Sequence, residues 1–195
     1  MPHKFDPAHV QELDRPDRQT WQRVDGLLDV VRPHPGAAYA DVGCGTGYFA
    51  IPAARRVAPD GKVYGLDVQT EMLEELRRRA RAGGLTNVIP LLSEENRIPL
   101  PSAGIEAAWS VNTFHEFEAP LALLYETSRI LSPGGKAFLV DWKPIDTPMG
   151  PPLEERVPAE RIKEALKAAG FTAIREHRIY AYHHVVEGAK RGGKR

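Results

Sequence analysis

The chain is 195 residues long, which suits one compact domain with a sizeable core. Basic and acidic side chains balance at 26 each, so no overall charge favours nucleic acid or an anionic membrane surface. The single cysteine, Cys44, excludes an intramolecular disulfide and a metal site built from several cysteines. No stretch resembles a signal peptide or a membrane span, and we therefore expect a cytoplasmic protein.

The first 35 residues are expected to form an arm and a helix outside the main fold. Residues 1–16 carry prolines and mixed charges without a clear period. From Asp17 onward, apolar side chains recur every three or four residues up to Val31, which predicts one amphipathic helix. Asp17 suits the N-cap of this helix, and the run Pro33-His34-Pro35 ends it.

Five strand patterns follow, and most of them are joined by helical patterns. The expected strands cover 37–42, 62–66, 87–92, 105–111 and 136–142. The expected helices cover 46–57, 70–82 and 118–131. This alternation is typical of a parallel sheet with helices on both faces, and such sheets bind ligands beyond the carboxyl ends of their strands.

The last part of the chain, 143–195, departs from this alternation. It holds a proline-rich loop over 145–157, a helical pattern over 159–169 and two strand-like runs over 171–178 and 181–187. The link between these runs is so short that it requires an antiparallel hairpin. We therefore predict a single α/β domain, a three-layer sandwich around a mostly parallel seven-stranded sheet whose last strand is antiparallel.

A glycine-rich turn follows the first expected strand, in the stretch Asp41-Val42-Gly43-Cys44-Gly45-Thr46-Gly47. Glycine tolerates positive φ and leaves room for a ligand, and the helix that follows offers unpaired N–H groups. Asp67 ends the next strand, so a parallel sheet places its carboxylate beside the turn, where it suits the two hydroxyls of a ribose. Tyr48 stands where a pyrophosphate-binding fingerprint has its third glycine, and the phosphate-loop pattern is absent. The pattern therefore indicates a nucleoside ligand that is bound neither through a pyrophosphate fingerprint nor through a phosphate loop.

Three motifs together resemble the class I S-adenosylmethionine-dependent methyltransferases. They are Asp41-Val42-Gly43-Cys44-Gly45-Thr46-Gly47, then Gly65-Leu66-Asp67-Val68 with Met72-Leu73, then Arg129-Ile130-Leu131-Ser132-Pro133-Gly134-Gly135. The resemblance covers 36–142 and is greatest to the small-molecule branch that includes the ubiquinone/menaquinone-biosynthesis methyltransferases. It implies a cofactor-binding core over 36–142, between the arm of 1–35 and a C-terminal part over 143–195.

The resemblance also implies how the chain holds S-adenosylmethionine as its cofactor. The backbone of Gly43, Gly45 and Gly47 would lie against the methionine part and the ribose. Asp41 would orient the ammonium group, and Asp67 would accept hydrogen bonds from the ribose hydroxyls.

The resemblance also implies which residues contact the adenine end of the cofactor. Val68 would pack against the adenine ring, and Met72 would close the same face. Glu94 stands where the family usually has an Asp that meets the adenine amino group, with the Glu95 N–H alongside. Asn112 would offer its backbone carbonyl to the methionine ammonium.

Methyl transfer to oxygen or acidic carbon requires removal of a proton. His115 and Glu116 follow the fourth expected strand at the ligand-binding edge of the sheet, which makes them the candidates for this step. His115 could equally be a packed side chain bonded to a backbone carbonyl. Tyr48 and Trp142-Lys143 lie at the same edge and are expected near the acceptor, whereas the neighbours His183-His184 point to opposite faces of a strand, which disfavours a metal pair.

The sequence does not identify the methyl acceptor. Helices at the position of the arm cover the acceptor pocket in many members of the family, so Phe5, Arg18 and Trp21 are expected to form a lid. The insertion after the fifth strand is short, so either a large acceptor or a second subunit, as in a homodimer, would complete the cover.

Three functions remain in competition at this stage. The leading one is methyl transfer from S-adenosylmethionine to an unidentified small or medium-sized organic acceptor. The alternative is a non-catalytic module that binds S-adenosylmethionine or S-adenosylhomocysteine. A nicotinamide-dependent oxidoreductase is disfavoured by the glycine spacing, and a nucleic-acid substrate by the balanced charge.

Overall fold

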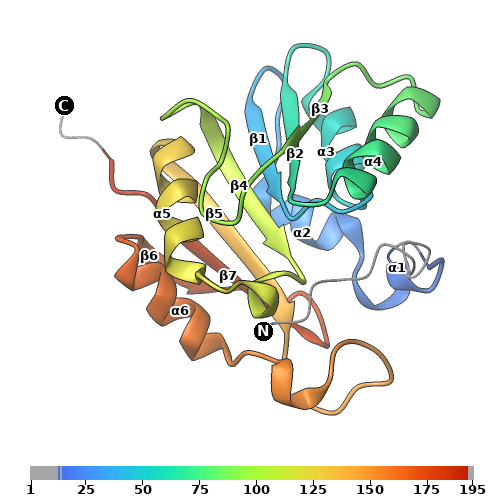
Figure 1. Ribbon diagram of the computed structural model, residues 1–195. Coiled ribbons are helices and arrows are strands. Elements are labelled where there is room, and N and C mark those ends of the chain that lie inside the picture. Colours follow the sequence, from blue (N-terminus) through green and yellow to red (C-terminus); the bar gives the residue numbers. More distant parts are fainter. Residues whose placement is uncertain (1–12, 14, 193–195) are drawn as a thin grey trace.

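The computed structural model describes residue 13 and residues 15–192. Its centre is a seven-stranded sheet with the strand order β3-β2-β1-β4-β5-β7-β6 (Figure 1). The strands are β1 Ala38–Val42, β2 Lys62–Asp67, β3 Val88–Leu92, β4 Ile105–Val111, β5 Leu131–Trp142, β6 Thr172–Glu176 and β7 His183–Ala189. The first five run parallel, and β7 is antiparallel to both β5 and β6, so the predicted fold class is confirmed.

Helices cover both faces of the sheet (Figure 1). The helices α2 Val24–Val31, α3 Ala50–Val57 and α4 Thr70–Ala82 contribute to the core on one face. The helices α5 Pro120–Ile130 and α6 Ala159–Ala168 contribute to the core on the other face. None of the helices in the described part of the chain combines the length and the apolar character that crossing a membrane requires.

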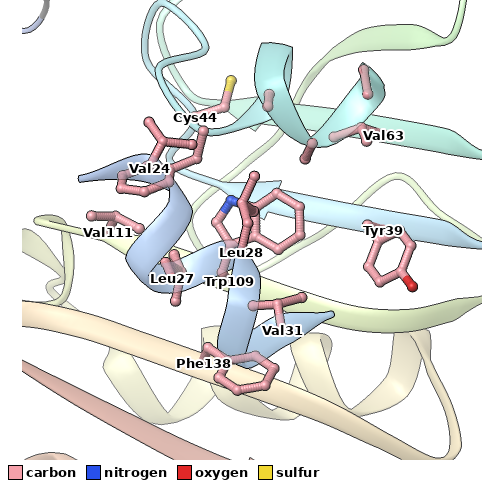
Figure 2. Packing of buried hydrophobic residues seen from close by; sticks show 14 of the residues in the cluster. Val24, Leu27, Leu28, Val31, Tyr39, Cys44, Val63, Trp109, Val111 and Phe138 are labelled. Atoms are coloured by element: carbon pink, nitrogen blue, oxygen red, sulfur yellow. The ribbon is translucent and has the colours of Figure 1, made fainter. Parts of the chain in front are cut away.

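The core under α2 shows why that helix packs where it does. Its apolar positions Val24, Leu27, Leu28 and Val31 are buried and face the sheet around Trp109 (Figure 2). The helix therefore brings the N-terminal segment against the strands that carry the predicted site.

The single helix predicted from Asp17 to Val31 is wrong in one respect, because the chain forms two helices, α1 Arg18–Trp21 and α2. The helix breaks at Gln22, whose side chain is fully buried and bonded to a distant strand end. Asp17 does not cap α1 with its side chain, because its carboxylate pairs with Arg15 at 3.0 Å.

Most other boundaries lie close to the predicted ones. The exceptions are α3, which begins at Ala50 and not near Thr46, and β5, which begins at Leu131 and not at Lys136. The turn after β1 is therefore four residues longer than predicted. The proline-rich loop also contains a short 3₁₀ helix, Leu153–Glu155.

The strand order fixes where a ligand can bind. From β1 the chain moves outward to β2 and β3, then crosses back to β4 on the other side of β1. Such a switch point opens a crevice at the carboxyl ends of the two central strands. In Figure 1, α1 and the loop 143–157 lie at this same edge of the sheet.

Candidate functional site

A cavity of about 630 Å³ lies at the carboxyl ends of the parallel strands. This volume falls within the range of roughly 300–1,000 Å³ that is usual for small-molecule sites. Its walls come from the arm, the glycine turn, the ends of β2, β3 and β4, and the loop after β5. Of the predicted site residues, those that line it are Asp41, Gly43, Gly45, Asp67, Val68, Met72, Glu94, Glu95, Asn112, His115 and Glu116.

The glycine turn and Asp67 form one hydrogen-bonded unit. The Gly45 N–H donates to Asp67 Oδ2 at 2.9 Å, and the Gln69 N–H donates to Asp67 Oδ1 at 3.0 Å. Each carboxylate oxygen has a second lone pair, so the fixed carboxylate can still accept from two hydroxyls. Burial raises the pKa of Asp67, while these N–H donors act in the opposite direction. This arrangement fits the ribose of a nucleoside cofactor.

Glycine is required at the three positions of the turn for different structural reasons. All have positive φ, but a Cβ on Gly43 would lie 2.7 Å from the Thr113 methyl, and a Cβ on Gly47 would lie 2.3 Å from Leu76. A Cβ on Gly45 would approach only Leu13, at 3.4 Å. Gly47 is not among the described residues that line the cavity, and it packs against Leu76 of α4.

Asp41 lies at the end of β1 with only 2% of its surface exposed. Burial raises the pKa of its carboxyl to about 7, and the negative charge of Asp67 adds to this shift. The positive charge of Arg18 acts in the opposite direction. A buried carboxyl that is only partly ionised near neutral pH is suited to gain from a cationic ligand such as an ammonium group.

The predicted adenine contacts gather at the β2 and β3 ends of the cavity. Val68 is half-exposed and Met72 is buried, and both line the cavity. Glu94 and Glu95 line it too, and the backbone of Glu94 forms a two-bond bridge with Arg97 that fixes the loop.

Asn112 is held by a pair of amide hydrogen bonds that the sequence did not reveal. Gln22 Nε2 donates to Asn112 Oδ1 at 3.0 Å, and Asn112 Nδ2 donates to Gln22 Oε1 at 3.2 Å. Arg18 donates to the same Gln22 oxygen through Nε and Nη2, and its guanidinium lies 4.0 Å from the ring centre of Tyr48. Asn112 has a positive φ of 58°, which an asparagine tolerates better than most residues. The arm therefore contacts the site directly, whereas Phe5, predicted to belong to the lid, lies outside the described residues.

His115 lies in the 3₁₀ helix Phe114–Glu116, beyond β4, and its side chain is 7% exposed. Its Nδ1 is 2.8 Å from Asp141 Oδ1, and its backbone N–H donates to Asp141 Oδ2 at 3.0 Å. Burial lowers the pKa of the ring, but the hydrogen bond to Asp141 and the nearby negative charges outweigh it, so the pKa is raised. Because Asp141 fixes Nδ1, the other nitrogen, Nε2, is the edge that remains for a ligand in the cavity.

Glu116 and the neighbours His183-His184 have different surroundings. Glu116 Oε1 lies 3.8 Å from His115 Nε2, beyond hydrogen-bond distance. His183 is buried against the rings of Trp21 and Trp142, whereas His184 bonds to Glu176 at 3.0 Å. The described residues contain no cluster of three or more metal-ligating side chains.

The loop 143–157 supplies another part of the cavity wall, although the sequence suggested little cover there. Arg156 holds this loop, because its guanidinium donates to the carbonyls of Ile145, Met149 and Pro151. Gly150 packs against the ring of Trp142, and both residues line the cavity. Both the arm and the clamped loop therefore contribute to the wall of the cavity.

Comparison with known proteins supports a single family. Residues 40–135 match the family described as a methyltransferase domain. The demethylmenaquinone methyltransferase of Symbiobacterium thermophilum is 37% identical over 111 residues, which cover 55% of this chain and 43% of that protein. Nocamycin O-methyltransferase of Saccharothrix syringae is 33% identical over 113 residues, which cover 58% of this chain and 40% of that protein. The chain spans less than half the length of both relatives.

A solved structure with substantial sequence identity matches nearly the full length of the chain. It is an S-adenosylmethionine-dependent methyltransferase from Aquifex aeolicus, with a TM-score of 0.88 and 34% sequence identity. The match covers 96% of this chain and 100% of that chain. Because the match covers nearly all of both chains, the two proteins share one fold that includes the sheet and the C-terminal hairpin. The chain therefore belongs to the class I S-adenosylmethionine-dependent methyltransferases.

Proposed function

We propose that the protein transfers the methyl group of S-adenosylmethionine to a small or medium-sized organic acceptor that must lose a proton. One observation carries this proposal: a single cavity joins the unit of Gly45 and Asp67 with the pair of His115 and Asp141. The first pair suits the cofactor and the second suits proton transfer, so both halves of the reaction share one space.

The cofactor would be held mainly by groups already fixed in the protein. Asp67 would accept from the ribose hydroxyls, Asp41 would orient the ammonium group, and Asn112 would offer its carbonyl to the same group. Val68 and Met72 would contact the adenine, with Glu94 and Glu95 at its polar edge. When bound, the cofactor would supply an electrophilic methyl group on a cationic sulfur.

His115 would accept the proton that the acceptor loses. Its Nδ1 bond to Asp141 favours the tautomer in which Nδ1 carries hydrogen and Nε2 holds a free lone pair. The same carboxylate stabilises the imidazolium that forms after proton transfer. Glu116 lines the same cavity and is the second candidate for this role.

A non-catalytic cofactor-binding module is the competing function. Such a module would also need Asp41, Asp67 and Asn112, so these residues do not discriminate. The residues on the acceptor side do discriminate between the two functions. His115 lines the cavity and is oriented by the buried Asp141, an arrangement that cofactor binding does not require. This pair favours catalysis.

The test combines transfer of a labelled methyl group into cell extracts with calorimetry of S-adenosylhomocysteine binding. We expect His115→Gln to lower turnover by about 10²- to 10⁴-fold while leaving the affinity for S-adenosylhomocysteine unchanged. Asp67→Ala should weaken that affinity by roughly 10- to 100-fold, as expected for lost hydrogen bonds to a charged group. Binding of NAD with similar affinity, or full activity of His115→Gln, would contradict the proposal.

A further inference from the structure

A second cavity adjoins the one described above. It has a volume of about 290 Å³ and lies where the arm meets the link between β6 and β7. Its walls are formed by Thr20, Trp21, Arg23, Met149 and 179–182. We call it the second cavity, and the cavity of about 630 Å³ the main cavity.

The volume of the main cavity limits what it can hold. Cavities of roughly 300–1,000 Å³ usually enclose one drug-sized ligand. The main cavity would have to receive S-adenosylmethionine, which is itself of that size, together with the methyl acceptor. A volume of about 630 Å³ therefore leaves room for the reacting end of an acceptor, and a longer acceptor must extend beyond it. The second cavity is slightly smaller than that range, so it suits a part of a ligand and not a whole one.

Two residues, Trp21 and Met149, line both cavities, and we call them the partition. The indole ring of Trp21 lies against the ring of Trp142, with the ring centres 5.4 Å apart. Trp142 lines the main cavity, and its backbone N–H donates to Asp141, the carboxylate that holds His115. The partition is therefore connected through Trp142 to the residues proposed to act on the acceptor.

Met149 is fixed by its backbone and not by its side chain. Its carbonyl accepts from the Thr147 hydroxyl at 2.6 Å and from Arg156 at 3.2 Å. The side chain is an unbranched thioether with three rotatable bonds, which adapts to the shape of a ligand at little cost. Met149 can therefore turn aside while the loop around it stays in place.

Trp21 is held by contacts between rings. It stacks on His183, with the ring centres 5.7 Å apart and the planes at 9°. Burial lowers the pKa of His183 to about 3, so its ring is a neutral stacking partner at physiological pH. The buried Nε1 of Trp21 has no hydrogen-bond partner among the described residues. A buried donor without a partner costs free energy and does not anchor the ring. No directional bond of the indole therefore opposes a shift of the partition.

The second cavity differs from the partition in chemistry. The partition presents a tryptophan and a methionine, which suit an apolar segment of a ligand. The walls of the second cavity include the residue types arginine, threonine and tyrosine, at Arg23, Thr20 and Tyr182. Guanidinium and hydroxyl groups donate hydrogen bonds, so these residues suit an end group that carries oxygen atoms.

We propose that the second cavity is a distal subsite for the methyl acceptor. The acceptor is then an elongated molecule with its reacting end at His115, an apolar middle across Trp21 and Met149, and an oxygen-bearing far end in the second cavity. The proposal rests on the proposed function in assuming that the acceptor reacts beside His115.

A series of 4-(ω-hydroxyalkyl)phenols tests the subsite without knowledge of the natural acceptor. The phenol supplies an acidic hydroxyl for His115, and chains of two, four, six and eight carbons carry the second hydroxyl away from it. The probes are titrated into the protein saturated with S-adenosylhomocysteine and followed by NMR of isotope-labelled tyrosine rings. We expect the affinity to rise by about tenfold or more along the series, because each methylene that leaves water favours binding. Only the longer probes should shift the signals of Tyr182. Longer probes that bind without shifting these signals, or binding of none of the probes, would overturn the proposal.

Matched variants locate the far end of the probes. Ala181→Trp fills the second cavity from an exposed position that is not among the described residues lining the main cavity. It should weaken binding of the longer probes several-fold and leave the two-carbon probe unchanged. Ala82→Trp is the control, because Ala82 is exposed at the end of α4 and is not among the described residues lining either cavity. If Ala181→Trp binds the whole series like the unaltered protein, the second cavity is not a subsite.

Met149→Ala tests the partition itself. The shorter side chain joins the two cavities, so the affinity of the longer probes should rise several-fold relative to that of the two-carbon probe. An unchanged ratio would reject the role of Met149 in the partition.

Failure of this proposal can be told apart from failure of the proposed function. Absence of S-adenosylhomocysteine binding, or of methyl transfer in extracts, would reject the function. An enzyme that transfers methyl groups, but whose affinity for the longer probes is the same in Ala181→Trp, would reject only the distal subsite.

Discussion

The ring of His115 is held at Nδ1 by Asp141, and the residue lines the cavity. Asp141 is fully buried and also accepts from the backbone N–H groups of His115 and Trp142, so its carboxylate cannot turn away. A carboxylate held in this way imposes both the orientation and the tautomer of the ring. Asp141 is therefore a positioning residue for the proposed base.

Asp141→Asn should lower the pKa of His115, because it removes the charge that raises it most. A base must be neutral to accept a proton, so activity is lost as the pH falls through its pKa. The acidic limb of the kcat/KM profile should therefore move to lower pH, by roughly one unit or more, while kcat falls. NMR titration of the His115 ring protons checks the shift directly. A midpoint that does not move would show that Asp141 has only a packing role.

If Asp41 orients the ammonium group of the cofactor as proposed, cofactor affinity should depend on pH. Its pKa of about 7 means that a cationic ligand must compete with a proton below neutral pH. Calorimetry should show the affinity for S-adenosylhomocysteine falling as the pH drops from 8 to 6, by up to tenfold per pH unit. Asp41→Asn should bind more weakly at pH 8 and lose this dependence. A pH-independent affinity of the unaltered protein would contradict the assignment.

The same shift has a consequence for the stability of the free protein. The pKa of Asp41 lies above its usual value of 3.8, so the folded state binds more protons than the unfolded chain between the two values. Stability is therefore lost as the pH rises from about 4 to 7. Asp41→Asn should raise the melting temperature at pH 8 in the absence of ligand, which denaturation scans at pH 5 and 8 would measure.

At the scale of elements, the sequence was informative wherever a local pattern decides the structure. The strands β1 to β4 and the place of Asp67 beside the glycine turn follow from short runs of residues and were predicted correctly, although the turn is longer than predicted. The break at Gln22 was not, because its cause is the hydrogen-bond pair with Asn112, which is 90 residues away. The clamping of the loop 143–157 by Arg156 was missed for a similar reason, since carbonyl acceptors leave no trace in a sequence.

Arg156→Met tests whether the loop 143–157 is held by its clamp. The variant loses three charged hydrogen bonds to carbonyls, and we expect a stability loss of roughly 2–3 kcal/mol. Amide hydrogen exchange should become faster over 145–155, and turnover should fall, while S-adenosylhomocysteine binds as before. Arg161→Met provides the control, because Arg161 is an exposed position of α6. Unchanged exchange in the loop would mean that the Trp142 packing alone holds it.

At the scale of the whole molecule, the strand order assembles the site. His115 follows β4 and Asp141 ends β5, and they meet because these strands are neighbours in the sheet. The sequence predicted parallel strands but not which of them are adjacent or which face Asp141 points to. Tertiary topology, which single-sequence patterns do not encode, supplied the partner of the proposed base.

An amide pair between Gln22 and Asn112 connects the arm to the end of β4, and this connection predicts that cofactor binding alters the arm. A ligand that contacts the Asn112 carbonyl should stabilise the Gln22–Asn112 pair and, through Gln22, the side chain of Arg18. Saturating S-adenosylhomocysteine should therefore slow amide hydrogen exchange over 18–23. In Gln22→Leu this slowing should shrink even when the ligand is saturating, because the apolar side chain leaves both partners without their bonds. Gln19→Leu, at an exposed position of α1, should behave like the unaltered protein. If the ligand protects 43–47 but leaves 18–23 unchanged in the unaltered protein, the arm is a static wall and not a coupled part of the site.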